Sequence, residues 1–132
     1  MTTSKKTGVI LVTHPEIGRA LLNIAKRIMP DQDVDITLVD VAMDKDCNTA
    51  KKQLAELIQA NDKGQGVLIL NDVFGATPFN IANAVLNEKT KLISGLNLSM
   101  LLRAITYQTL PLEQLAEKTR DGGLNGVRLL EK

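Results

Sequence analysis

The single histidine of this chain, His14, stands one residue after a short aliphatic segment, residues 9–12. The neutral imidazole ring is a nucleophile, and its ordinary pKa of about 6.5 lets it change charge near neutral pH. A buried structural histidine or a plain surface histidine is the alternative interpretation. Loops that follow buried strands carry a large share of binding and catalytic residues. The position of His14 therefore favours a functional role.

A carboxylate occupies the corresponding place in another apolar segment, since Asp72 follows residues 66–70. A carboxylate that accepts a hydrogen bond from one ring nitrogen fixes the tautomer of a histidine and leaves the other nitrogen free to attack. It also stabilises the charged imidazolium. The alternative is a turn aspartate that accepts a hydrogen bond from a nearby backbone N–H. We expect Asp72 to orient His14 if the fold brings the two strand ends together.

A turn of small residues, Gly75-Ala76-Thr77, follows Asp72 and precedes a predicted helix with Thr77 as its N-cap and Pro78 as its first residue. Glycine allows close approach of the backbone to a ligand, and a helix N-terminus favours an anion by about 0.3–1 kcal/mol. The alternative is that this turn only connects a strand to a helix, as any α/β protein requires. Farther along, Asn97 and Ser99 either cap the next helix or line the same edge, and capping is favoured for Ser99.

Short aliphatic runs alternate with amphipathic stretches along the chain, and this alternation predicts the elements that position these side chains. Pro15 is expected in the first turn of the first helix. Gly122-Gly123 are expected to lie in a non-helical segment after the last helix. The predicted strands are residues 9–12, 34–39, 66–70, 91–94 and 127–130, and the predicted helices are residues 15–29, 44–60, 77–86, 98–107 and 111–120.

Strands and helices in this order predict an α/β fold, a doubly wound and mostly parallel sheet with helices on both faces. Such sheets bind ligands beyond the carboxyl ends of their strands, where neighbouring connections diverge to opposite faces. The ends of the predicted strands include His14 and Asp72. The pattern thus predicts one site that contains both residues.

Composition limits the remaining possibilities. The 132 residues fit one domain, 1–132, with a flexible N-terminus at about residues 1–6. A net charge of +1 and 2% aromatic residues argue against nucleic-acid binding. One cysteine and one histidine argue against a disulfide or a zinc site, and we expect neither metal nor cofactor. No apolar run reaches the roughly 18 residues of a membrane span and no signal peptide is apparent, so we expect a cytoplasmic protein.

Three segments together resemble the enzyme IIA domain of the mannose–fructose–sorbose family of the bacterial phosphotransferase system. Residues 8–14, Gly-Val-Ile-Leu-Val-Thr-His, resemble the family's first strand and its phosphorylated histidine. Residues 70–80 are similar to its Asp-x-x-Gly-Gly-Ser-Pro-Phe-Asn segment, and residues 95–101 to its Gly-x-Asn-x-Pro-Met-Leu segment. The resemblance extends from Gly8 to about Val127, which is almost the whole chain.

The resemblance implies a function and partners. His14 would accept a phosphoryl group from the carrier protein phospho-HPr, through Nε2, while Asp72 holds Nδ1–H. Thr77, in the place of the family's serine, would offer its hydroxyl to the phosphoryl oxygens beside Gly75 and Ala76. The group would then pass to a IIB domain for sugar uptake, so the chain would be peripheral to a membrane permease at most. A homodimer that exchanges the last strand, residues 127–130, is also implied.

The sequence departs from the family's pattern at three places. Pro15 replaces a glycine, which removes a backbone N–H beside the site. Gly75-Ala76-Thr77 replaces Gly-Gly-Ser and keeps the hydroxyl, and Ser99 replaces a proline. Two alternatives stay open. In one, the phosphorylation state of His14 controls a regulatory protein without transport. In the other, the chain is a receiver domain phosphorylated on Asp72, although His14 stands where receivers carry acidic residues that bind magnesium.

Overall fold

The structure is a computed structural model of the chain, and it describes residues 5–42 and 46–132. Within these residues the elements follow one another in the order β1 (Gly8–Thr13), α1 (Ile17–Ile28), β2 (Thr37–Asp40), α2 (Cys47–Asn61), β3 (Val67–Asn71), α3 (Thr77–Ala84), β4 (Thr90–Ser94), α4 (Leu98–Thr106) and α5 (Leu112–Asn125). The predicted flexible N-terminus lies outside the described residues for positions 1–4, and so does Asp44, the predicted start of α2.

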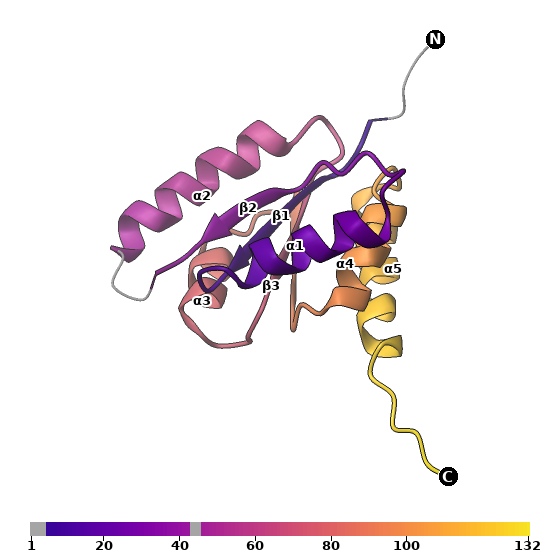
Figure 1. The fold of residues 1–132 in the computed structure, drawn as a ribbon. Coiled ribbons are helices and arrows are strands. Elements are labelled where there is room, and N and C mark those ends of the chain that lie inside the picture. The colour runs from indigo at the N-terminus through magenta and orange to yellow at the C-terminus, as the bar shows by residue number, and fades with distance from the viewer. Residues whose placement is uncertain (1–4, 43–45) are drawn as a thin grey trace.

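The four strands of the described chain form one parallel sheet in the order β2-β1-β3-β4. Helices cover both faces (Figure 1). Every residue of the central strands β1 and β3 is buried, which explains their continuous apolar sequences. Alternate residues point to opposite faces, so Leu11 and Leu70 pack with α1, α4 and α5, whereas Ile10 and Ile69 pack with α2 and α3. The predicted doubly wound α/β fold is confirmed.

The strand order decides where ligands can bind. The chain passes from β1 through α1 to β2, towards one edge of the sheet. It passes from β3 through α3 to β4, towards the opposite edge. These two connections lie on opposite faces, because α1 and α3 belong to different core clusters. The carboxyl ends of β1 and β3 therefore form the switch point of the sheet. His14 and Asp72 are the first residues after these ends.

Several predicted boundaries are wrong by a few residues, and the reasons are local. Strand β2 begins at Thr37 rather than at residue 34. Pro15 lies before α1 rather than in its first turn, because the chain first makes a turn in which Ile17 N–H donates to the His14 carbonyl at 3.3 Å. Helix α3 has Ala76, not Thr77, at its N-cap, so that Thr77 is the first helical residue and Pro78 the second.

Two helix ends in the second half of the chain also differ from the sequence prediction. Asn97, not Ser99, caps α4, since its side chain accepts a hydrogen bond from Met100 N at 2.8 Å. Helix α5 continues through Gly122 and Gly123 to Asn125. A Cβ on Gly123 would lie 2.6 Å from Met100 Cε, so these glycines allow α5 to approach α4 closely rather than interrupt the helix.

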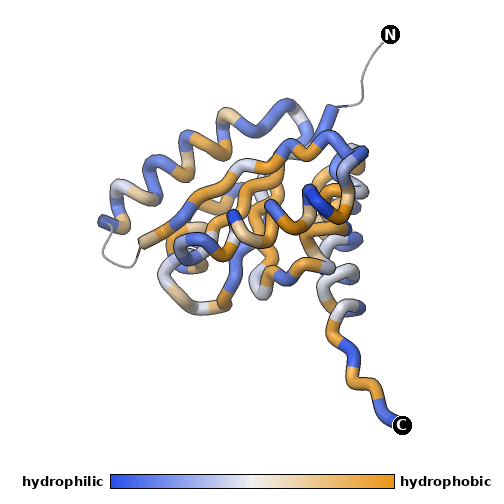
Figure 2. The backbone as a smooth tube through the Cα atoms, in the orientation of Figure 1, coloured by the Kyte–Doolittle hydropathy of each residue, from blue (hydrophilic) through white to orange (hydrophobic). Residues whose placement is uncertain are grey.

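The predicted last strand is absent from the single chain. Residues 127–130 form neither helix nor strand and extend away from the body at the C-terminus (Figure 1). Figure 2 shows that this segment is largely hydrophobic, and Arg128 is its one charged residue. Its apolar side chains are nevertheless exposed, with Val127 at 77% and Leu129 and Leu130 at 85%. No neighbouring strand within the described chain supplies the hydrogen bonds that a strand here requires.

Candidate functional site

The structure brings His14 and Asp72 into direct contact at the carboxyl ends of β1 and β3. Asp72 Oδ2 lies 2.7 Å from His14 Nδ1 and 3.1 Å from the backbone nitrogen of His14. The Asp72 side chain is 4% exposed and that of His14 is 20% exposed. A carboxylate can only accept hydrogen bonds, so Nδ1 carries the proton in this arrangement. The lone pair of the neutral ring then lies on Nε2.

The contact between these residues follows from the sheet register. Strands β1 and β3 are direct parallel neighbours, with Val12 paired to Asn71, so the residues that follow them leave the sheet side by side. A nearly buried carboxylate is costly unless hydrogen-bonded donors compensate for the lost water. Asp72 obtains two such donors from one residue, the backbone N–H and the ring N–H of His14. The pair therefore keeps the carboxylate in place as much as it orients the ring.

Thr13 holds the loop that presents His14, and the sequence reasoning missed it. Its hydroxyl accepts a hydrogen bond from Gly18 N at 3.0 Å and donates one to the His14 carbonyl at 2.8 Å. It thereby performs the task of an N-cap for α1, whose actual N-cap residue, Glu16, makes no side-chain hydrogen bond there. The sequence signal for this role is a threonine between the end of a strand and the start of a helix.

Asn71 is a second supporting residue that was not singled out. This fully buried side chain ends an otherwise apolar strand, and its amide contacts the Ser94 hydroxyl. In the orientation that satisfies both ends of the amide, its oxygen accepts from Asp72 N at 3.1 Å and Phe79 N at 3.3 Å. The backbone carbonyl of Asn71 also accepts a hydrogen bond from Leu96 N at 2.9 Å. Asn71 thus links the loops after β3 and β4, and a buried polar residue was its signal.

The predicted phosphate-binding turn lies at the same end of the sheet and begins three residues after Asp72. Gly75 has a φ of +85°, a left-handed conformation that favours glycine, and the space where a Cβ would stand is open. Helix α3 starts after Ala76 without a side-chain cap. Pro78 has no N–H and Phe79 N is bound by Asn71, so the N–H and hydroxyl of Thr77 are the donors that α3 offers to an anion.

The neighbouring strand end adds one ion pair. Asp40, which closes β2 and pairs in register with Thr13, lies 3.9 Å from the guanidinium of Arg19 on α1. Both side chains are partly exposed, so this pair contributes little to stability. Among residues 5–42 and 46–132, no three His, Cys, Asp or Glu side chains gather in a way that could hold a metal ion.

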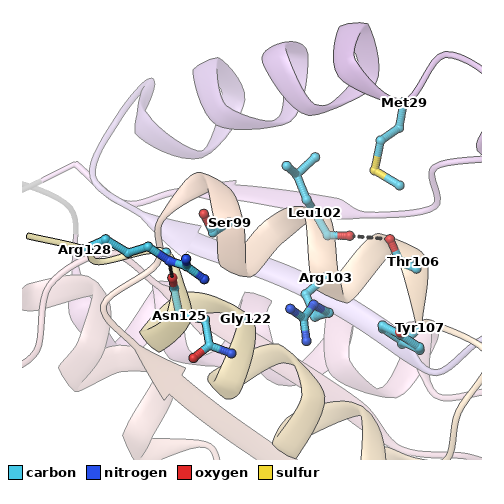
Figure 3. A pocket seen from close by; sticks show the side chains of 10 residues that line it. Met29, Ser99, Leu102, Arg103, Thr106, Tyr107, Gly122, Asn125 and Arg128 are labelled. Atoms are coloured by element: carbon cyan, nitrogen blue, oxygen red, sulfur yellow. Dashed lines mark hydrogen bonds between the residues drawn. The ribbon is translucent and has the colours of Figure 1, made fainter. Parts of the chain in front are cut away.

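A separate cavity lies away from this site, between α4 and the end of α5 (Figure 3). It has a volume of about 590 Å³, and its lining includes Met29, Arg103 and Arg128. Ser99 lines this cavity rather than the edge of the sheet where His14 stands. None of the five predicted site residues takes part in it. The predicted site at the strand ends and this cavity are therefore separate features of the molecule.

The parallel sheet and the carboxylate-bound histidine at its switch point define an α/β protein with a candidate nucleophilic imidazole. Residues 8–119 match the family model EIIA-man, described as the PTS system fructose IIA component. The chain belongs to this family. In the described part of the chain, no helix has both the length and the apolar composition needed to cross a membrane.

Curated and solved proteins agree with this assignment. The chain is 24% identical over 128 residues to the PTS system mannose-specific EIIAB component of Escherichia coli K12; the match covers 94% of the chain and 39% of that relative. The chain thus spans about two fifths of the length of the curated relatives it matches.

Two solved structures share the fold. The mannose/sorbose-specific IIA subunit from Enterococcus faecalis superposes with a TM-score of 0.84 at 22% identity, covering 97% of both chains. The phosphotransferase system component EIIA from Streptococcus agalactiae has a TM-score of 0.79 at 25% identity, covering 92% of this chain and 95% of that one.

Proposed function

We propose that this chain is a phosphoryl carrier that accepts a phosphoryl group on His14 Nε2 and passes it on. The observation that carries the proposal is the 2.7 Å contact between His14 Nδ1 and Asp72 Oδ2. This contact leaves Nε2 with the lone pair that a nucleophile needs. Membership of the IIA family and the position at the switch point support the same role.

The transfer step balances without a metal or a cofactor. The lone pair of Nε2 forms a bond to phosphorus while the bond between phosphorus and the donor atom breaks, and the donor keeps that electron pair. Nδ1 retains its proton, so the phosphorylated ring becomes cationic, and the carboxylate of Asp72 stabilises this charge at hydrogen-bond distance. Transfer to the next acceptor reverses these changes and restores the neutral ring.

The turn after Asp72 is the proposed phosphoryl-binding element. A phosphoryl group brings a charge of about −1.5 to −2, and the hydroxyl and N–H of Thr77 would donate to its oxygens at the start of α3. Gly75 and Ala76 keep this turn free of bulky side chains, since the space at Gly75 is open. The helix N-terminus adds a favourable field of about 0.3–1 kcal/mol.

The proposed donor is phospho-HPr and the proposed acceptor is a IIB domain that feeds sugar uptake. The relatives that carry the term mannose-specific EIIAB in their names support this direction. This role places the chain in the cytoplasm, peripheral to a membrane permease at most. The regulatory alternative, in which the phosphorylation of His14 controls a partner protein without transport, is not favoured by the family description.

Labelling with phosphoenolpyruvate, HPr and the enzyme that phosphorylates HPr tests the proposal. The chain should acquire an acid-labile label, and His14→Ala should acquire none. Label that persists in His14→Ala would overturn the proposal. An acid-stable label lost in Asp72→Asn would point instead to an acyl phosphate on Asp72, as in a receiver domain.

We also propose a homodimer in which the C-terminal segment 127–130 adds to the sheet of a second copy. Strand β4 is an edge of the sheet, and a cavity of about 380 Å³ lined by Leu92, Ile93 and Ala116 runs between β4 and α5. Pairing there would cover the exposed Leu129 and Leu130 side chains and satisfy the backbone of the segment. Light scattering should show a dimer for the full chain and a monomer when residues 127–132 are removed. A dimer that survives this truncation would refute strand exchange.

A further inference from the structure

The cavity between α4 and the end of α5 takes no part in the functions proposed above. Its volume of about 590 Å³ lies within the range of roughly 300–1,000 Å³ that is typical of small-molecule sites. Its walls come from separate parts of the chain, with Met29 at the end of α1, Ser99 and Arg103 on α4, and Asn125 at the end of α5. Figure 3 shows these side chains around the cavity. The space is therefore large enough for a small organic molecule.

The charged side chains that line this cavity are cationic. They are Arg103 on α4 and Arg128 after α5, and no Asp or Glu is among the described residues of the lining. Within residues 5–42 and 46–132, neither guanidinium forms an ion pair with a carboxylate. Lys118 adds a third positive charge beside the wall, since its Nζ lies 5.1 Å from the centre of the Tyr107 ring. Charge of one sign in a cavity concentrates ligands of the opposite sign, so this cavity favours an anion.

Both arginines are held at the cavity by local structure. The stem of Arg103 lies against α5 at Gly122, where a Cβ would stand 2.7 Å from Arg103 Cβ. Arg128 Nε donates to the Asn125 carbonyl at 2.9 Å, and this bond leaves the terminal N–H groups of Arg128 for a ligand. Figure 3 shows Asn125 and Arg128 at one end of the cavity and Arg103 nearer its middle. Side chains that are already ordered lose less freedom when they bind an anion.

Apolar side chains complete the lining. Met29, Leu102 and Tyr107 line the cavity and also pack against the core cluster beneath α1 and α4. The Thr106 hydroxyl already donates to the Leu102 carbonyl at 2.8 Å, so that proton is not offered to a ligand. Small-molecule sites commonly combine apolar walls with a few polar groups that fix the orientation of the ligand. The lining thus matches a molecule with one anionic group and one apolar part.

We propose that this cavity binds a small organic phosphate, with Arg103 and Arg128 holding the phosphate group and Leu102 and Tyr107 contacting the apolar part. The planar guanidinium donates paired hydrogen bonds that match phosphate oxygens. A phosphate monoester carries a charge of about −1.5 to −2 near neutral pH, so it matches two arginines, whereas a carboxylate matches one. A purely apolar ligand would separate both guanidinium groups from water without compensation. The site does not involve His14 and goes beyond the proposed phosphoryl transfer.

The probe for this site is phenyl phosphate, which combines a phosphate monoester with an aromatic ring. Titration of the nitrogen-15-labelled full chain should shift the backbone amide signals of Arg103, Tyr107 and Gly126, and all three should give the same Kd. Arg103→Gln and Arg128→Gln should each raise that Kd about tenfold or more, because each removes hydrogen bonds to a charged group. Phenol, which lacks the phosphate, should leave these signals in place. Inorganic phosphate should bind more weakly than phenyl phosphate, because it gains nothing from the apolar wall.

Arg120→Gln is the matched control. Arg120 lies on α5 outside this cavity, is 60% exposed and pairs with Asp121 at 3.4 Å. The variant removes the same charge and should leave the Kd for phenyl phosphate unchanged. The thermal midpoint of each variant is compared with wild type, and Arg128→Gln keeps the test decisive if Arg103→Gln unfolds, because Arg128 is exposed. Arg103→Lys, which keeps the charge without the planar fork, should weaken binding less than Arg103→Gln.

Four results would overturn the inference. One is the absence of shifts around the cavity at millimolar phenyl phosphate. Another is an equal loss of affinity in Arg120→Gln, which would assign the binding to overall charge. Shifts confined to His14 and Thr77 would place the anion at the proposed phosphoryl site instead. A dimer by light scattering in which the cavity amides do not respond would assign the cavity to contact between copies of this chain.

Discussion

Replacing Asp72 by asparagine is the sharpest test of how this site works, because it removes one charge and keeps the shape of the side chain. In the structure Asp72 Oδ2 accepts from both the ring and the backbone of His14. An amide oxygen in that position would still accept, without the charge that stabilises a cationic ring. An amide nitrogen in that position would instead force the proton of the neutral ring onto Nε2 and remove the nucleophilic lone pair.

The size of the effect follows from the charged hydrogen bond. Such a bond contributes about 1.5–3 kcal/mol, and each 1.36 kcal/mol of barrier is a tenfold change in rate, so transfer should slow roughly 10- to 150-fold. The loss should fall on the limiting rate rather than on the KM, because the positive charge on the ring develops only during transfer.

Rapid-quench labelling from phospho-HPr measures the rate, and nitrogen-15 spectra of the His14 ring report which nitrogen carries the proton. Wild type should show protonation at Nδ1, and Asp72→Asn should weaken or reverse this preference. Asp33→Asn is the matched control, since the Asp33 side chain is 96% exposed. A limiting rate in Asp72→Asn within twofold of wild type, together with an unchanged Nδ1 proton, would refute the reasoning.

Three further predictions concern stability. Glu16 has a φ of +76°, so Glu16→Gly should relieve about 1–2 kcal/mol of backbone strain. Glycine costs about 0.5–1 kcal/mol in backbone entropy, so urea unfolding should show a small net gain in the free energy of unfolding. A loss of stability would contradict this prediction. Gly66→Ala would place a Cβ 2.6 Å from the Lys89 carbonyl oxygen and should cost more than about 2 kcal/mol. Gly64→Ala would place its Cβ no closer than 4.0 Å to Lys5 Nζ and should cost only the backbone strain of about 1–2 kcal/mol. Equal costs would exclude the steric explanation. Hydrogen bonds from the backbone N–H groups of Gly64 and Gly66 lower the pKa of Asp62, so its contribution to stability is present above pH of about 4 and lost as the pH falls through the lowered value. The difference in unfolding free energy between wild type and Asp62→Asn should therefore shrink only in acid, and a difference independent of pH down to pH of about 2 would contradict this assignment.

The type and order of the strands and helices were easier to predict than the residues at which each helix begins and ends. The buried strands β1 and β3 could be predicted from the sequence because parallel strands that are covered on both faces are apolar throughout. The alternation of such strands with amphipathic stretches predicts the sheet. Helix ends depend on which oxygen reaches a free N–H. Asn97 and Ser99 both have a suitable oxygen, and only the path of the chain decided that Asn97 caps α4.

The glycines near the C-terminus show a different limit. Sequence rules treat Gly122-Gly123 as a break, because glycine lowers helix stability. The close approach of α5 to α4, where a Cβ on Gly122 would lie 2.7 Å from Arg103 Cβ, makes glycine necessary within the helix instead. Similarly, the short and largely apolar segment 127–130 follows a glycine and predicts a strand, but a strand forms only where a neighbour supplies hydrogen bonds. Neither condition is visible along the chain itself.

The sequence by itself determined the types of residue at the strand ends: one histidine after the first strand and one aspartate after the third. Residue type and local periodicity are properties of short segments, so they are readable without the fold. Only the tertiary structure decided that Asp72 meets Nδ1 of His14 rather than capping its own turn, and that Thr13 and the buried Asn71 support the two loops. Those contacts depend on the parallel register of β1 and β3, which joins residues 58 positions apart in the sequence.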